Sequence, residues 1–247
     1  MKVGVFDSGI GGLTVVKSLL QHQLFEEIIY FGDTARVPYG SKDKTTIIRY
    51  AIEAVEFFQN FELDLIIVAC NTVSAYALSE MREVSSCPVI GVVEAGILAT
   101  DNALKSKDSN VLILGTKATI NSKAYERGLV SLGFKNLQAK ATGLFVSLVE
   151  EEIYNGEVLE ATFKHYFNET TSPNAIILGC THFPLISDSL QNYFSQETIL
   201  IHSGDAIVEY LQKEFNFIVK YEKPKLEFYA SENPEALKAV GKKWLNL

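Results

Sequence analysis

Short runs of apolar and β-branched residues recur along the 247-residue chain, and most runs end at a glycine or a polar residue. Their apolar positions are continuous rather than alternating, which is typical of strands covered on both faces of a sheet. The predicted strands are KVGVFD (2–7), EIIYFGD (27–33), LDLIIVAC (63–70), PVIGVV (88–93), NVLILGT (110–116), NAIILGC (174–180), TILIHS (198–203) and KLEFYA (225–230).

Segments with helical spacing of apolar residues lie between these runs. They cover 43–61, 72–84, 117–132 and 144–167. The C-terminal stretch from GDAIVEYLQKEF (204–215) to NPEALKAVGKKWLNL (233–247) exceeds what a second half needs, and we expect it to fold back on the first half. An alternation of strands and helices predicts parallel, doubly wound sheets.

The chain repeats one arrangement of strand, turn and cysteine. VGVFDSGIGG (3–12) precedes VACNTVSA (68–75), and VLILGTKATI (111–120) precedes ILGCTHFP (177–184). The repetition predicts an α/β protein with two pseudosymmetric doubly wound domains. We place residues 1–92 and 207–247 in the first domain, with the C-terminal segment folding back, and residues 93–206 in the second.

Composition narrows the function classes. Hydrophobic residues make up 47% of the chain, which excludes disorder, and the net charge of −8 with no cluster of Lys or Arg argues against nucleic acid or an anionic membrane as a partner. The N-terminus shows no secretory leader and no apolar run approaches the ~20 residues of a membrane span. Three cysteines are too few for a disulfide framework, so a cytoplasmic protein with free thiols is expected.

Four polar loops follow predicted strands, at the edge where open α/β sheets bind ligands. They are DSGIGG (7–12), ACNT (69–72), GTKAT (115–119) and GCTH (179–182). The first is not a dinucleotide loop, because Thr14 stands where the third glycine of G-x-G-x-x-G would be, and the chain has no P-loop.

The cysteines differ in their expected roles. A lone cysteine is usually a small buried hydrophobe, which is our interpretation of Cys87. Cys70 and Cys180 each end a strand and begin a predicted helix, where the helix dipole would lower a thiol pKa from ~8.5. With His182 they could supply three metal ligands, but no C-x-x-C or H-x-x-x-H spacing supports a site, and no metal is expected.

Two separated thiols suit proton transfer better than disulfide exchange, which needs a resolving thiol nearby. Racemisation requires a base on one face of a carbon and an acid on the other, and two facing half-sites supply both. A carbanion beside a carboxylate also needs hydrogen bonds, which Ser8, Asn71, Thr72 and Thr181 can donate.

The sequence resembles the glutamate racemases of the cofactor-independent aspartate/glutamate racemase family over nearly its whole length. The resemblance rests on FDSGIGGLTV (6–15), YFGDTARVPYG (30–40), ACNTVSA (69–75), GVVEAG (91–96), LFVSLVEE (144–151) and LGCTHFPL (178–185). It implies an active site between two domains and interconversion of L- and D-glutamate without a cofactor. The product would serve peptidoglycan synthesis, and we expect a homodimer.

The resemblance also implies roles for individual residues. Cys70 and Cys180 become the two acid/bases, with Asp7 and His182 as their catalytic partners, and Glu150 contacts the substrate ammonium or tunes the second thiol. The substrate contacts expected are Asp7, Ser8, Tyr39, Gly40, Asn71, Thr72, Thr116, Glu150, Thr181 and His182.

Three alternatives stay open at this point. An aspartate racemase of the same family would differ in pocket depth, which the sequence does not show. A pyridoxal-phosphate racemase would need a Schiff-base lysine, for which Lys117 is the candidate. A non-catalytic amino-acid-binding module would close on its ligand without turnover, although two thiols would be superfluous for binding.

Overall fold

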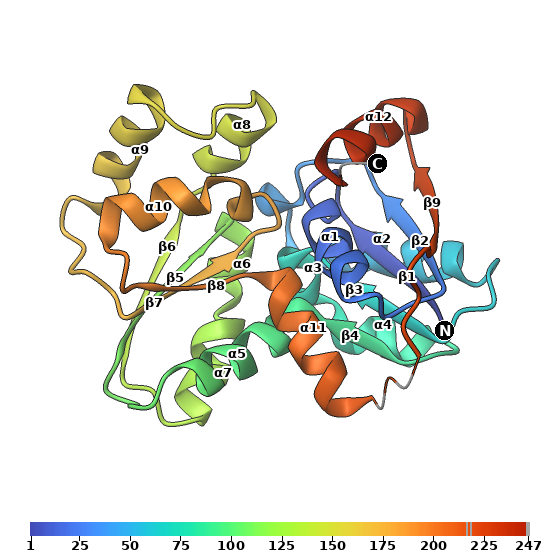
Figure 1. The fold of residues 1–247 in the computed structure, drawn as a ribbon, viewed down its shortest axis with the longest axis horizontal. Coiled ribbons are helices and arrows are strands. Elements are labelled where there is room, and N and C mark those ends of the chain that lie inside the picture. The colour runs from blue at the N-terminus through green and yellow to red at the C-terminus, as the bar shows by residue number, and fades with distance from the viewer. Residues whose placement is uncertain (216, 218, 246–247) are drawn as a thin grey trace.

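Two parallel β-sheets flanked by helices form the protein (Figure 1). The computed structural model describes residues 1–215, 217 and 219–245. The first sheet has the order β4-β3-β1-β2-β9 and the second the order β6-β5-β7-β8, and every strand pair is parallel. The predicted α/β class with parallel sheets is therefore confirmed. The strands are β1 (Lys2–Asp7), β2 (Glu27–Gly32), β3 (Leu65–Val68), β4 (Val89–Gly91), β5 (Asn110–Gly115), β6 (Asn136–Ala141), β7 (Ala175–Gly179), β8 (Ile199–Ile201) and β9 (Lys225–Ala230).

The two sheets repeat one strand order. Read from the other edge, the second sheet runs β8-β7-β5-β6, which corresponds to β4-β3-β1-β2 of the first. In the first sheet the chain passes from β1 to β2 on one side of it and then to β3 on the other side, and in the second sheet it passes in the same way from β5 to β6 and then to β7. A topological switch point therefore lies between β1 and β3 and another between β5 and β7. Ligands bind outside the carboxyl ends of strands at such switch points. All four polar loops follow these four strands.

The C-terminal segment completes the first sheet. Strand β9 pairs with β2, from Lys225 opposite Glu27 to Ala230 opposite Gly32. The boundaries expected at 92/93 and 206/207 stay a prediction, and Asn246 and Leu247 of the expected first domain lie outside the described residues.

One strand escaped prediction. Strand β6 is an edge strand with the sequence NLQAKA, and none of its residues is fully buried. An edge strand with alternating polar residues lacks the continuous apolar run by which the other eight strands were recognised.

Three of the predicted helices are divided in the structure. The segment 72–84 breaks at Ala77, the segment 117–132 breaks at Lys123 with φ of 54°, and the segment 144–167 breaks over 151–156. Likewise the predicted strand 88–93 ends at Gly91, where a helix begins. The helices are α1 (Leu13–His22), α2 (Lys44–Phe58), α3 (Asn71–Tyr76), α4 (Leu78–Val84), α5 (Val92–Ala103), α6 (Lys117–Ser122), α7 (Ala124–Ser131), α8 (Leu144–Glu150), α9 (Glu157–Phe167), α10 (Ser187–Phe194), α11 (Ser203–Glu214), α12 (Pro234–Leu245) and the short 3₁₀ helices η1 (Tyr39–Ser41) and η2 (Phe183–Ile186).

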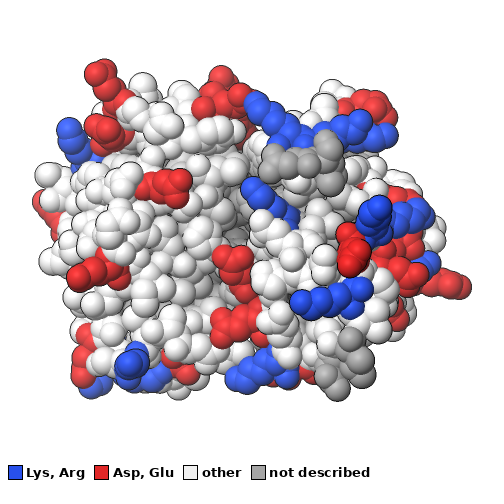
Figure 2. Space-filling view, viewed as in Figure 1, with Lys and Arg blue, Asp and Glu red and all other residues white. Residues whose placement is uncertain are grey.

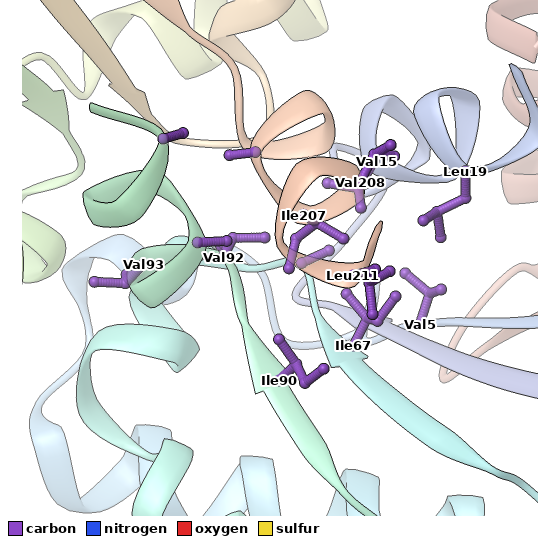
Figure 3. Close-up of a cluster of buried hydrophobic side chains, with 14 of the residues drawn as sticks. Val5, Val15, Leu19, Ile67, Ile90, Val92, Val93, Ile207, Val208 and Leu211 are labelled. Atoms are coloured by element: carbon purple, nitrogen blue, oxygen red, sulfur yellow. The ribbon is translucent and has the colours of Figure 1, made fainter. Parts of the chain in front are cut away.

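One hydrophobic core joins the two sheets. Figure 3 shows Ile207, Val208 and Leu211 of α11 lying among side chains of β1, β3 and β4 and of α5. The same cluster includes Val111 and Ile177 of the second sheet. Helix α11 packs on both α5 and α1, so the helices between the sheets fix one sheet relative to the other.

Charges on the face shown in Figure 2 are of both signs and interspersed. Within the described part of the chain, no helix combines the length and apolarity needed to cross a membrane.

The shared core predicts a large loss of stability when a buried side chain of α11 is shortened. Ile207 is fully buried, so Ile207→Ala should lower the free energy of unfolding by about 2–5 kcal/mol, measured by urea titration. Ile199→Ala removes the same atoms from a side chain that is 38% exposed on β8 and should cost less than about 1 kcal/mol. Equal losses in the two variants would contradict the role assigned to α11.

Candidate active site

A pocket of about 470 Å³ lies where the loops of the two sheets meet. Its walls come from the loops after β1, β3, β5 and β7, from the segment before α2 and from α8. Every residue expected at the site lines this pocket except Asp7, which lies beneath it. The expected residues that line it are Ser8, Tyr39, Gly40, Cys70, Asn71, Thr72, Thr116, Glu150, Cys180, Thr181 and His182.

Cys70 enters the pocket from the first sheet. It is the N-cap residue of α3 and is 5% exposed, and its Sγ lies 3.5 Å from Ser8 Oγ. Burial, together with the nearby Asp7 carboxylate, raises the pKa of this thiol to about 12. The helix start at Cys70 is thus as expected, but the lowered thiol pKa expected from the helix dipole is wrong, because desolvation of the thiolate outweighs the dipole of a six-residue helix.

Cys180 enters from the second sheet through a different local structure. No α-helix begins there, contrary to expectation: Thr181 and His182 form a turn, and the 3₁₀ helix η2 follows at Phe183. Pro184 lies at the second position of η2 and has no backbone N–H to donate within a helix. The Sγ atom of Cys180 therefore does not lie at the N-terminus of an α-helix, and its partner is a side chain.

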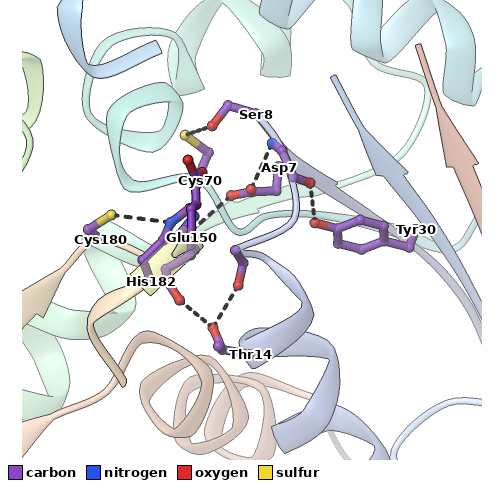
Figure 4. A network of polar contacts seen from close by, with 11 residues as sticks. Asp7, Ser8, Thr14, Tyr30, Cys70, Glu150, Cys180 and His182 are labelled. Atoms are coloured by element: carbon purple, nitrogen blue, oxygen red, sulfur yellow. Dashed lines mark hydrogen bonds and ion pairs between the residues drawn. The ribbon is translucent and has the colours of Figure 1, made fainter. Parts of the chain in front are cut away.

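That partner is His182, which links Cys180 to Glu150 (Figure 4). Cys180 Sγ lies 3.8 Å from His182 Nδ1, and His182 Nε2 lies 3.1 Å from Glu150 Oε1. Burial lowers the pKa of His182, but the hydrogen bonds with Cys180 and Glu150 more than compensate and raise it to about 10. The imidazole is therefore a cation at neutral pH, and it lies beside the sulfur of Cys180.

Asp7 supports the pocket from below. It is fully buried; its Oδ2 accepts a hydrogen bond from Gly9 N at 2.9 Å, and its Oδ1 accepts one from Thr181 Oγ1 at 3.3 Å. Burial raises its pKa, while the charge of His182 acts in the opposite direction. Asp7 therefore connects the loop after β1 with the loop after β7.

The side chain of Asn71 forms its hydrogen bonds within the protein. Its Oδ1 accepts a hydrogen bond from Tyr125 OH at 2.6 Å, and its Nδ2 donates to Ser203 Oγ at 3.2 Å. Ser203 begins α11 and Tyr125 lies on α7, so this buried amide joins the cysteine loop of the first sheet to helices that pack on the second. The amide nitrogen of Asn71 carries a second N–H besides the one that Ser203 accepts, so the expected donation to a ligand stays a prediction.

Three threonine hydroxyls form a cluster across the pocket wall. Thr72 Oγ1 lies 2.9 Å from Thr116 Oγ1 and 3.1 Å from Thr119 Oγ1, and the latter two are 3.0 Å apart. Gly40 lies against this cluster, because a Cβ there would come within 2.5 Å of Thr116 Cβ. Thr119 was not among the residues expected at the site, although it belongs to GTKAT (115–119), one of the four polar loops.

Tyr39 faces the pocket while its hydroxyl is held elsewhere. The phenol donates to Asp33 Oδ2, and Arg36 Nε binds the same carboxylate oxygen at 2.6 Å. Burial raises the pKa of Tyr39, and the hydrogen bond to Asp33 adds to that effect. Tyr39 therefore presents a neutral ring at a fixed position.

Sequence reasoning missed the contribution of α8 other than Glu150. Gly143, Val146 and Ser147 also line the pocket, and Val37 with Pro38 lies among its apolar residues. The spacing of 143, 146–147 and 150 is that of one helix face, which is the signal that could have identified them. Lys117, the candidate Schiff-base lysine, also lines the pocket but is exposed.

The suggested metal set does not assemble. Among residues 1–215, 217 and 219–245, no group of three or more His, Cys, Asp or Glu side chains is placed to hold a metal ion. The arrangement instead offers two thiols, one cationic imidazole, one carboxylate and several hydroxyls around a single space. Such a set can remove and return a proton at a carbon atom held between the thiols.

Known proteins are similar to this chain in sequence and fold over nearly its whole length. A family model described as Asp/Glu/hydantoin racemase matches residues 13–211. The glutamate racemase of a Nitratiruptor species is 60% identical over 99% of this chain and 96% of its own. The crystal structure of glutamate racemase from Campylobacter jejuni has a TM-score of 0.99 at 55% identity, covering 100% of this chain and 99% of that one. The Francisella tularensis glutamate racemase in complex with D-glutamate has a TM-score of 0.87 at 37% identity, covering 100% and 94%.

The link between His182 and Glu150 predicts a pKa change. Glu150→Gln removes an anionic partner, so the pKa of His182 should fall from about 10 by about one unit, measured by NMR titration of the imidazole. Because the folded pKa is raised, the stabilisation by the protonated imidazole is fully present below pH 6.5 and is lost as the pH rises through about 10. An unchanged His182 titration would refute the link.

Proposed function

The chain belongs to the Asp/Glu/hydantoin racemase family, and from that premise we propose that it interconverts L- and D-glutamate by proton transfer between two thiols. The observation that carries the proposal is the convergence of Cys70 and Cys180 on one pocket from equivalent strand ends of two pseudosymmetric sheets. Relatives named glutamate racemase, 50–60% identical over nearly the whole chain, support the choice of substrate.

The two thiols have different surroundings before substrate enters. The pKa of about 12 keeps Cys70 protonated at neutral pH, while Cys180 lies beside the cationic His182. The family resemblance assigns Cys180 to L-glutamate and Cys70 to D-glutamate. A protonated Cys70 can therefore act as the acid when the L-enantiomer is converted.

The pocket also favours the carbanion that forms between the thiols. Ser8, Thr72 and Thr181 bring hydroxyl groups to its wall, and hydrogen bonds from such groups stabilise charge that develops on a carboxylate. Glu150 supplies the carboxylate for the substrate ammonium while it also holds His182. Gly40 and Thr116 complete the wall on the side of the first sheet's loops.

The cellular role follows from the product. D-glutamate is a component of peptidoglycan, and we place the protein in the cytoplasm as a homodimer that supplies it. Incubation of L-glutamate and L-aspartate with the protein, followed by circular dichroism, tests the proposal. Loss of the glutamate signal alone supports it, loss of the aspartate signal alone indicates the sister activity, and tight binding without loss indicates a binding module.

Replacement of each cysteine tests the two-thiol mechanism. Cys70→Ser and Cys180→Ser should each lower racemisation at least about 10³-fold, because serine is a far weaker acid than a thiol at neutral pH. Cys87→Ser removes a half-buried cysteine that does not line the pocket and should stay within about twofold of the unchanged protein. Full activity in either pocket variant would exclude the mechanism.

A second prediction concerns cofactors. If the thiols carry the reaction alone, exhaustive chelation should leave the turnover of L-glutamate unchanged, and the purified protein should show no absorbance band of a lysine aldimine. Lys117→Gln should likewise retain racemisation, since a Schiff-base lysine would be essential in a pyridoxal-phosphate enzyme. Activity lost on chelation and restored by zinc would point to a metal instead.

A further inference from the structure

We propose that Thr14 is a positioning residue that holds the Cys180 loop against the loop after β1, and thereby sets the reactivity of one thiol and not the other. The inference rests on the proposed racemase function. Thr14 lies in the first turn of α1, outside the pocket, and touches neither cysteine in the contacts given by the structure.

The hydroxyl of Thr14 joins the loop after β1 to Thr181, which lies 167 residues after Thr14 in the chain. Thr14 Oγ1 lies 2.9 Å from Gly11 O and 2.9 Å from Thr181 O, and Figure 4 draws both contacts. A hydroxyl carries one proton, so the two carbonyls share it. Thr181 is 4% exposed, and within the described residues its carbonyl has no other hydrogen-bond donor.

Gly11 shows how closely the two loops approach. A Cβ at this position would lie 2.3 Å from Thr181 Oγ1 and 2.7 Å from His182 Nδ1, distances that real Cβ atoms do not adopt. The loop after β1 therefore fits against the turn that carries His182 only because Gly11 has no side chain. Thr14 fixes this contact from one side of the turn and Asp7 fixes it from the other, through Thr181 Oγ1 at 3.3 Å.

The consequence for catalysis falls on Cys180. Thr181 is the residue between Cys180 and His182, so a shift of its carbonyl moves both partners of the 3.8 Å contact between Cys180 Sγ and His182 Nδ1. Cys70 is held instead by the start of α3 and by Ser8. Loss of the Thr14 hydroxyl should therefore displace one of the two acid/bases and leave the other in place.

Thr14→Val removes the hydroxyl at nearly constant volume and is the central variant. We expect kcat to fall about tenfold or more, since small displacements of a reacting group have effects of that size, while KM changes less than about threefold. Thr14→Ser restores the hydroxyl and should recover most of kcat. Thr162→Val is the matched control, because the buried Thr162 hydroxyl also donates to a backbone carbonyl, Val158 O at 2.8 Å, but lies on α9 away from the pocket.

The decisive measurement is the ratio of α-proton exchange to racemisation in heavy water, taken from each enantiomer. A misplaced Cys180 returns a proton to the carbanion slowly, so inversion is slow. The enantiomer that Cys70 deprotonates should therefore regain its hydrogen more often on the face that Cys70 reaches. The hydrogen regained there should be a deuteron from the solvent. Its ratio should rise about tenfold in Thr14→Val, in proportion to the slower inversion. From the other enantiomer the ratio should stay constant, because Cys70 still completes each inversion.

The assignment of enantiomers comes from the experiment itself. Cys180→Ser retains only the exchange that Cys70 performs, and thereby identifies which enantiomer should show the raised ratio. A loss of folded protein lowers the rates of exchange and of racemisation by the same factor, so both ratios stay unchanged. If Thr14→Val does not fold, Thr14→Ala removes the same hydroxyl and should give the same one-sided rise.

Each outcome decides the inference. A one-sided rise with recovery in Thr14→Ser supports it. Unchanged kcat, a rise from both enantiomers, or an equal effect in Thr162→Val overturns it. Absence of glutamate turnover by the unaltered protein would instead overturn the proposed function, so the two failures are distinguishable.

Discussion

The structure depends on one constraint: two parallel sheets must present their switch points to the same small space. Each sheet alone would bind a ligand at its carboxyl edge, but only one face of that ligand would then be reached. The buried residues of α11 and α5 pack against β1, β3 and β4 on one side and share a cluster with β5 and β7 on the other. Burial of apolar surface between the sheets thus brings two thiols to one pocket.

Within the pocket, the neighbouring residues create a difference between two chemically identical groups, which are buried to the same extent. Cys70 lies near the buried Asp7 and has a raised pKa, whereas Cys180 lies beside a histidine that carries a positive charge. A pseudosymmetric fold would by itself give two equivalent thiols. The difference comes from the residues around them, namely Asp7 and Ser8 at one and His182 and Glu150 at the other. A racemase needs such a difference, since one thiol must be charged while its partner is not.

Much of this could be predicted from sequence, for identifiable reasons. Strands buried on both faces give continuous apolar runs, so eight of the nine strands in the described part of the chain were recognised, and β6 was missed because it is a polar edge strand. The repeated cysteine motif located the pocket, since the carboxyl ends of parallel strands meet at one edge. The raised pKa of Cys70 could not be predicted, because local sequence shows a helix start but does not show the depth of burial. Breaks such as that at Lys123 were missed because the apolar spacing continues across them.

The side chains that hold the two halves in register carry the least sequence signal of all. Tyr125 and Ser203 have neither unusual composition nor a motif around them, yet both bind the amide of Asn71. In the sequence, Thr14 stands out only as the residue that replaces the third glycine of a dinucleotide-binding motif. In the structure its hydroxyl bonds with the carbonyl of Thr181, the residue after Cys180. Contacts of this kind join residues far apart in the chain, and no local pattern can indicate them. The chemistry of a pocket between two halves can therefore be inferred from motifs, but the precision with which its groups are placed depends on contacts that only the folded chain reveals.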